Sequence, residues 1–160
     1  MAAKSTEISE GSKAPAFDLP TDAGGRIKLA DLRGKKVVLY FYPKDDTPGC
    51  TREAVEFSAL AKSFRRAGAV IVGVSKDSVA KHDKFKEKHG LTVTLAADEA
   101  GKTVTDYGVW VEKSLYGRKY MGIDRSTFVI DQKGVVRGIW RKVKVPGHVE
   151  EVLAAVKAIG

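Results

Sequence analysis

The chain has 160 residues, 43% of them hydrophobic and 30% charged, as in an ordinary globular protein. This length suits one domain, so we expect a single domain over residues 1–160, with a loose lead-in at residues 1–10. No apolar run approaches the ~20 residues that cross a membrane, and the N-terminus lacks the apolar core of a signal peptide. A single cysteine excludes an internal disulfide, so we expect a cytoplasmic protein.

The net charge of +8 first suggests a nucleic-acid partner. The basic residues are dispersed along the chain, however, and the three histidines show no metal-ligand spacing. We therefore expect a solvated basic surface, with no nucleic-acid partner, no membrane partner, no cofactor and no metal.

The first predicted elements are short strands. Apolar and polar residues alternate around residues 17–19 and 26–29, on either side of a glycine-containing turn, which predicts an N-terminal β-hairpin. The apolar run at Lys36–Phe41 predicts a strand buried on both faces. Apolar residues at helical spacing then predict one helix over residues 51–66, which Gly68 ends.

The rest of the chain alternates between strand and helix patterns. The expected elements are strands at 70–75, 91–96, 126–130 and 135–140 and helices at about 78–89, 99–107 and 149–159. Residues 107–122 show no clear period, so we expect irregular structure there. This order predicts an α/β domain of the thioredoxin kind, with a mixed central sheet flanked by helices.

The only cysteine, Cys50, lies where the predicted buried strand is followed by the first turn of the next helix. Free backbone N–H groups and the positive end of the helix dipole point at such a place and stabilise a thiolate. Cys50 is therefore a candidate nucleophile. The alternative is a small buried hydrophobic residue, which is how most lone cysteines behave.

The residues before Cys50 favour the reactive interpretation. Pro43, Thr47 and Cys50 form the spacing Pro-x-x-x-Thr-x-x-Cys, which resembles the peroxiredoxin signature. The strings FYPKDDTPGCT at 41–51 and RSTFVID at 125–131 are similar to those of the bacterioferritin comigratory (type Q) class. The resemblance runs from about Gly11 to the end. It implies a thioredoxin-like fold and an antioxidant enzyme of cell redox homeostasis, a thiol-dependent peroxidase for hydrogen peroxide and organic hydroperoxides.

Peroxide reduction needs an ionised sulfur, a peroxide held in line and stabilisation of charge on the departing oxygen. Cys50 is the expected nucleophile, and the Thr47 hydroxyl can contact the peroxide or the thiolate. The N–H groups around Gly49 and Cys50 can act as fixed donors. Pro43 is expected to close the pocket and shield the thiolate, although it can also be merely a strand terminator.

The resemblance also implies a cation, Arg125, carried over from the arginine at the start of a late strand in the family. A guanidinium stays charged and can stabilise both the thiolate and the transition state. Glu53, one turn after Cys50, can orient Arg125 through a paired hydrogen bond. The alternatives are an ordinary surface arginine and a solvated helix glutamate.

The chain departs from many relatives, which carry a second, resolving cysteine five residues after the first or in the following helix. Here these positions are Val55 and, for the helix, a place near Lys86. We therefore expect a one-cysteine cycle in a monomer, with thioredoxin, glutaredoxin or a small thiol reducing the sulfenic acid. The alternatives are a peroxide sensor or redox-controlled binding protein that uses Cys50 oxidation as its signal, and a thioredoxin-like module with an inert cysteine.

Overall fold

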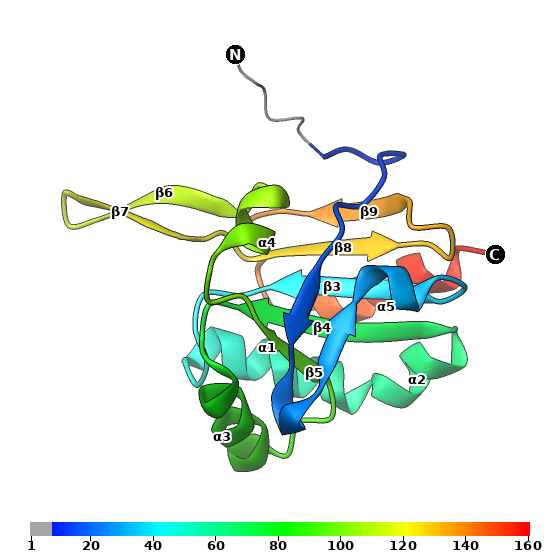
Figure 1. The fold of residues 1–160 in the computed structure, drawn as a ribbon, viewed down its shortest axis with the longest axis horizontal. Coiled ribbons are helices and arrows are strands. Elements are labelled where there is room, and N and C mark those ends of the chain that lie inside the picture. The colour runs from blue at the N-terminus through cyan, green and yellow to red at the C-terminus, as the bar shows by residue number, and fades with distance from the viewer. Residues whose placement is uncertain (1–7) are drawn as a thin grey trace.

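The computed structural model describes residues 8–160, so most of the lead-in expected at residues 1–10 lies outside the described residues. The centre of the fold is a five-stranded sheet in the order β5-β4-β3-β8-β9 (Figure 1). Its strands are β3 (Lys36–Phe41), β4 (Ala69–Ser75), β5 (Thr94–Ala97), β8 (Ser126–Ile130) and β9 (Val136–Trp140). Strand β3 runs parallel to β4 and antiparallel to β8, which confirms the predicted mixed sheet.

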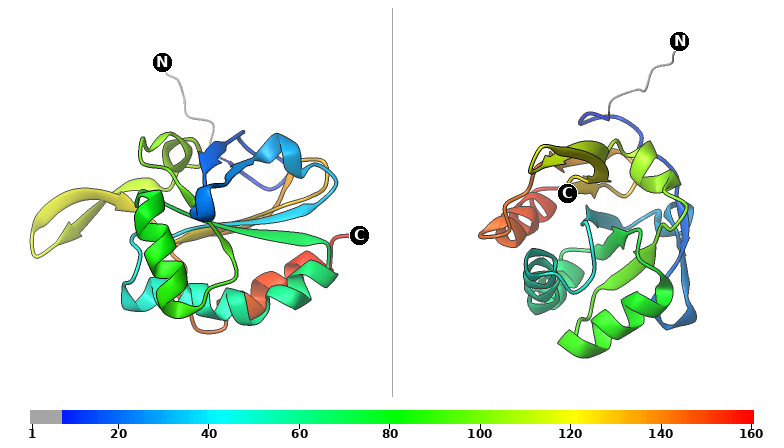
Figure 2. Two further views of the ribbon diagram at one scale, coloured as in Figure 1. Left: turned by 60° about the horizontal axis from the view of Figure 1, so that its bottom comes forward. Right: turned by 90° about the vertical axis from the view of Figure 1, so that its left-hand side faces the viewer.

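Two layers cover this sheet (Figure 2). The helices are α1 (Pro48–Ala59), α2 (Ala61–Arg66), α3 (Val79–His89), α4 (Lys102–Asp106) and α5 (His148–Lys157). Helices α1, α2 and α5 lie on one face, and α4 lies on the other together with the N-terminal hairpin of β1 (Asp18–Pro20) and β2 (Arg26–Lys28). Short 3-10 turns, η1 (Asp22–Gly24) and η2 (Leu29–Leu32), follow these two strands. The predicted N-terminal hairpin is therefore confirmed.

Strand β3 is buried along its whole length and divides the core in two. Because side chains alternate across a strand, Val38 and Tyr40 pack with the aromatic residues of α1 to α3, whereas Leu39 and Phe41 pack against β1 and α4. The strand ends at Phe41, and a loop at 42–47 connects it to α1. The fold thus places the start of α1 at the end of a central strand.

The single helix expected over residues 51–66 is wrong, because the structure has two. Helix α1 starts earlier, at Pro48, and α1 and α2 meet at Leu60, where ψ is 11°. The N–H group of Leu60 donates to the carbonyls of both Glu56 and Phe57, so the last turn of α1 tightens there. The spacing of apolar residues continues through the break, which is why the sequence pattern does not show it.

The irregular segment expected at residues 107–122 is also wrong. Strands β6 (Trp110–Leu115) and β7 (Arg118–Ile123) form a separate antiparallel hairpin that projects from the body (Figure 1). Tyr116 and Gly117 form its turn, with φ angles of 52° and 77°, as a two-residue hairpin turn of the primed kind requires. Most of its side chains are exposed on both faces, so burial leaves no alternating pattern in the sequence.

Candidate active site

Cys50 lies in the first turn of α1 and is buried. Thr47 occupies the N-cap position and Pro48 the first helical position, where a missing N–H group costs nothing. The first N–H groups of a helix have no partner inside it, and they lie at its positive end. The local sequence therefore holds the sulfur where negative charge is stabilised.

Arg125 supplies a full positive charge at the same place. Its Nη2 lies 3.3 Å from Cys50 Sγ, and its Nη1 donates to Glu53 Oε1 at 2.7 Å. Arg125 directly precedes β8, and the next residue, Ser126, pairs with Phe41 at the end of β3. The pairing of two central strands thus brings the guanidinium to the sulfur.

Glu53 holds the other side of this guanidinium and is fully buried. Burial raises the pKa of Glu53 to about 7, although the charge and hydrogen bond of Arg125 lower it. Burial lowers the pKa of Arg125, but the negative charges of Cys50 and Glu53 outweigh this effect and raise it. Among the described residues, Glu53 Oε2 and the Tyr40 hydroxyl are buried oxygens without a hydrogen-bond partner.

Three further predicted site residues lie in the loop before Cys50 and in the first turn of α1. A Cβ atom on Gly49 would lie 3.1 Å from Arg125 Nη2, so the absence of a side chain there lets the guanidinium approach. The Thr47 hydroxyl donates to the Lys44 carbonyl at 2.8 Å, which leaves its oxygen lone pairs to accept. Pro43 is exposed at the start of the loop. The structure therefore brings Gly49, Glu53 and Arg125 together around Cys50.

A buried polar network that was not predicted from the sequence anchors this loop. Asp45 accepts a hydrogen bond from the Tyr42 hydroxyl at 2.6 Å and lies 2.6 Å from His82 Nδ1. The other ring nitrogen of His82 lies 3.0 Å from the Ala96 carbonyl. The ring nitrogens of His82 thus lie against two acceptors, the Asp45 carboxylate and the Ala96 carbonyl, in the interior of the protein. No sequence spacing links Asp45 to His82, because α3 brings the histidine to the loop.

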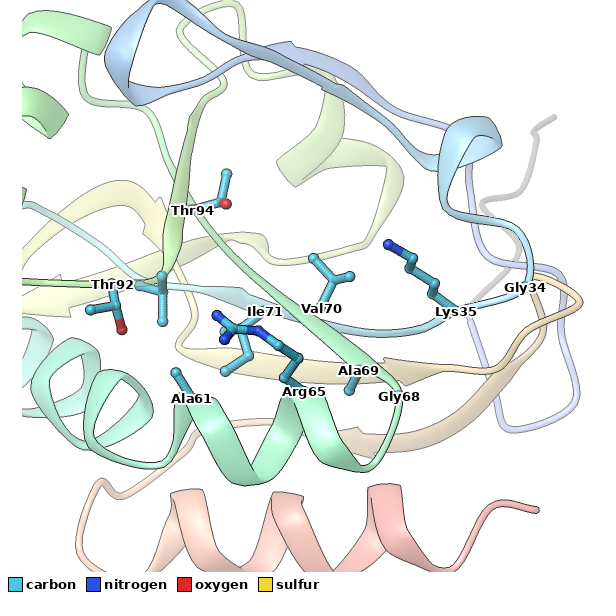
Figure 3. A pocket seen from close by; sticks show the side chains of 11 residues that line it. Gly34, Lys35, Ala61, Arg65, Gly68, Ala69, Val70, Ile71, Thr92 and Thr94 are labelled. Carbon is cyan, nitrogen blue, oxygen red and sulfur yellow. The ribbon is translucent and has the colours of Figure 1, made fainter.

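Other candidate sites lie elsewhere or lack the necessary groups. An open pocket of about 370 Å³ lies at the far end of the sheet, where Lys35 precedes β3 and Arg65 belongs to α2 (Figure 3). Within residues 8–160, no group of three or more His, Cys, Asp or Glu side chains could hold a metal ion. No helix in that part of the chain is both long and apolar enough to span a bilayer.

Comparison with known proteins gives the family. The sequence profile of the AhpC/TSA family matches residues 11–139, which is most of the chain. The chain belongs to this family of peroxiredoxins. The peroxiredoxin is 53% identical over 146 residues to a putative peroxiredoxin Bcp of Coxiella burnetii, covering 91% of this chain and 97% of the relative. It is 51% identical over 150 residues to the peroxiredoxin Bcp of Bacillus subtilis, covering 94% and 96%.

Solved structures agree with these relatives. Peroxiredoxin Q of Xanthomonas campestris superposes with a TM-score of 0.86 at 45% identity, covering 89% of this chain and 90% of that one. A mutant of Xylella fastidiosa PrxQ gives a TM-score of 0.90 at 38% identity, covering 96% and 98%. These findings confirm the resemblance to the type Q class, the thioredoxin-like fold and the enzyme class, a thiol-dependent peroxidase. With its one cysteine, this peroxiredoxin fits a one-cysteine peroxidase.

The two positions at which a resolving cysteine was considered have other surroundings in this peroxiredoxin. Val55 lies on α1 and is 42% exposed. The Lys86 ammonium on α3 lies 2.7 Å from Asp22 Oδ2, an ion pair between the helix and the N-terminal region. Neither side chain carries a thiol that could meet oxidised Cys50.

Proposed function

We propose that Cys50 is the nucleophile with which this enzyme reduces hydrogen peroxide and organic hydroperoxides. The thiolate attacks one peroxide oxygen, and the S–O bond forms as the O–O bond breaks. Cys50 becomes a sulfenic acid, while the other oxygen leaves as hydroxide or alkoxide and takes up a proton. The observation that carries the proposal is the 3.3 Å contact between Arg125 Nη2 and the buried Cys50 sulfur. A Xanthomonas campestris relative described by its alkyl peroxide reduction activity supports organic substrates.

Arg125 stabilises the thiolate before the reaction and the charge on the departing oxygen during it. A fixed guanidinium acts in this way without having to reorganise as the transition state forms. Gly49 leaves room for it, and the N–H groups of the first turn of α1 act beside it. The Thr47 oxygen accepts a hydrogen bond from the O–H group of the bound peroxide, since its own hydrogen is donated to the Lys44 carbonyl.

Glu53 and Pro43 have supporting roles in this proposal. Glu53 is a positioning residue, because its Oε1 holds Arg125 Nη1 at 2.7 Å and so fixes which nitrogen faces Cys50. Pro43 restricts the backbone at the start of the loop and shields the thiolate from water.

The sulfenic acid is reduced by a thiol from another molecule. The incoming thiolate attacks the Cys50 sulfur, a mixed disulfide forms and hydroxide leaves to become water. A second thiol then attacks the incoming sulfur of this disulfide and releases the Cys50 thiolate. Thioredoxin, glutaredoxin and small thiols all supply these two electrons. Because the chain has one cysteine, no internal thiol traps the sulfenic acid, and excess peroxide carries Cys50 on to the sulfinic acid.

We also propose that the enzyme is cytoplasmic and monomeric. A lone cysteine that other thiols must regenerate works best where thiols are kept reduced. The net charge of +8 opposes self-association, which favours the monomer.

The test is peroxide consumption with and without an added thiol, in wild type and in Cys50→Ser. The proposed function predicts many turnovers per enzyme with dithiothreitol and none in the variant. Without the thiol it predicts one equivalent of peroxide consumed, and a second equivalent when excess peroxide carries Cys50 on to the sulfinic acid. A single stoichiometric oxidation that the thiol does not turn into repeated cycles would instead favour a peroxide sensor.

A further inference from the structure

The exposed large apolar side chains of residues 8–160 are found on two elements, α1 and the hairpin of β6 and β7. Val55 is on α1, one turn beyond Cys50, and the others belong to the hairpin of β6 and β7. The hairpin members are Leu115, Tyr116, Tyr120 and Met121. Exposed apolar patches that have no partner inside the molecule commonly mark interaction surfaces.

We call the hairpin at residues 110–123 the arm. It projects from the end of the sheet at which the loop before α1 lies (Figure 1 and the left view of Figure 2). Its second strand leads directly into Arg125, and at its base the N–H group of Asp124 donates to the Val109 carbonyl at 2.8 Å. The Lys76 ammonium lies 4.3 Å from the centre of the Trp110 ring, which also holds the base in place. The arm is thus tied to the active-site cation.

Apolar and basic side chains are interleaved along the arm. The strand register places Leu115 beside Arg118 and Tyr120 beside Lys113 on one face. Met121 lies on the other face, and Tyr116 at the tip is 96% exposed. The Lys113 ammonium donates to the Ile123 carbonyl at 2.5 Å, so its stem stays flat against the arm.

The charge of the arm narrows the class of its partner. The arm carries three basic residues and one acidic residue, in a chain whose net charge is already +8. The basic residues are Lys113, Arg118 and Lys119, and the acidic residue is Glu112. A second copy of the chain would bring like charges together, whereas an acidic partner would be attracted. The enzyme also needs a thiol from another molecule. A protein that supplies this thiol must dock on a surface beside the buried sulfur, whereas a small thiol needs no docking surface.

We propose that the arm is the docking surface for the reductant, an acidic dithiol protein. This inference rests on the proposed function, in which an external thiol reduces the Cys50 sulfenic acid. The first thiol of the partner forms the mixed disulfide and releases hydroxide. Its second thiol displaces the Cys50 thiolate, so the partner leaves as a disulfide, oxidised by two electrons. The arm supplies affinity and orientation, and takes no part in the attack on peroxide.

The experiment compares two reductants across matched charge reversals. The variant is Arg118→Glu with Lys119→Glu, both exposed on the arm. The control is Arg33→Glu with Lys35→Glu, which makes the same change in charge at the far end of the sheet, beside the pocket that Lys35 lines (Figure 3). The reductants are a thioredoxin of negative net charge, kept reduced by its reductase and NADPH, and dithiothreitol.

The expected result is a fall of at least tenfold in kcat/KM for thioredoxin in the arm variant only. Turnover with dithiothreitol and the rate of Cys50 oxidation by peroxide should match wild type. The double substitution Leu115→Ser with Tyr120→Ser should also lower the kcat/KM for thioredoxin. Added salt should lower this kcat/KM more in wild type than in the arm variant.

Two results would overturn the inference while leaving the peroxidase intact. One is wild-type turnover with dithiothreitol but not with thioredoxin. The other is a kcat/KM for thioredoxin that falls equally in the arm and control variants, or in neither. This result would also overturn the inference if the arm variant were found to lose binding to a DNA duplex instead. If wild type turns over with neither thiol, the proposed function fails, and the inference fails with it.

Discussion

Arg125 and Cys50 are 75 positions apart in the chain, yet Arg125 Nη2 lies 3.3 Å from Cys50 Sγ. The contact follows from the pairing of β8 with β3, two strands in the centre of the sheet. Glu53, on the same helix as the cysteine, holds the other end of the guanidinium. The cation is therefore held by rigid elements on both sides, as a preorganised electrostatic site requires.

Replacing Arg125 should slow the attack on peroxide. Arg125→Ala is expected to lower the second-order rate constant of Cys50 oxidation by about 10²-fold or more, the scale of losing one preorganised donor. Stopped-flow fluorescence or quenched mass spectrometry measures this rate. The control is Arg137→Ala, because Arg137 is an exposed arginine paired with Asp131. Equal rates in both variants would remove Arg125 from the mechanism.

Adding one carbon at Gly49 should separate activity from stability. The new Cβ of Gly49→Ala would lie 3.1 Å from Arg125 Nη2, and Glu53 limits how far the guanidinium can retreat. We expect peroxide attack to slow by about tenfold, the effect of a partly displaced donor. Alanine favours a helix over glycine by about 1 kcal/mol, so the free energy of unfolding should stay the same or rise. A variant as fast as wild type would show that Arg125 moves freely.

The hydroxyl of Thr47 can be tested by two substitutions of different chemistry. Thr47→Val keeps the shape but removes the oxygen, and it should slow Cys50 oxidation by about tenfold or more, as the loss of one active-site hydrogen bond does. Thr47→Ser keeps the oxygen and should retain most of the rate. Full activity in the valine variant, measured in the same rapid oxidation assay, would exclude the hydroxyl from catalysis.

The buried Glu53 should make stability depend on pH. Its pKa is raised from 4.5 to about 7, so the folded state binds more protons than the unfolded state between these values. The ionisation of Glu53 should therefore lower the stability of the wild type as the pH rises through this range. Relative to Glu53→Gln, which cannot titrate, the loss should be about 3 kcal/mol in the free energy of unfolding. Urea unfolding at a series of pH values measures it.

The control for this experiment is Glu87→Gln, which changes an exposed glutamate on α3. Its stability should run parallel to that of wild type across the pH series. If wild type and Glu53→Gln also run parallel, the ionisation of Glu53 is not perturbed by folding.

Patterns of burial in the sequence correctly predicted much of the fold. Strand β3, the N-terminal hairpin and the approximate bounds of α3 all follow from local spacing and from residues that favour helix ends. The break at Leu60 could not be predicted in this way, because the apolar spacing continues through it. The arm could not be predicted either, because its side chains are mostly exposed and show no apolar period. The Tyr116-Gly117 turn was the one local signal for the arm.

The site was predictable only in part. Cys50 stands out as the single cysteine, but Arg125 could be named only through the resemblance to peroxiredoxins. The burial of Glu53 follows from packing by distant segments, and no local pattern distinguishes it from a solvated glutamate. The same holds for Asp45 and His82, which tertiary structure joins across 37 positions.

The most direct test is the time course of Cys50 oxidation. Reduced protein is mixed with one equivalent of hydrogen peroxide at neutral pH and its intact mass is followed, with Cys50→Ser as control. The account predicts one added oxygen within seconds in wild type only, reversed by an added thiol. A cysteine that stays reduced for many minutes, like an ordinary free thiol, would contradict it.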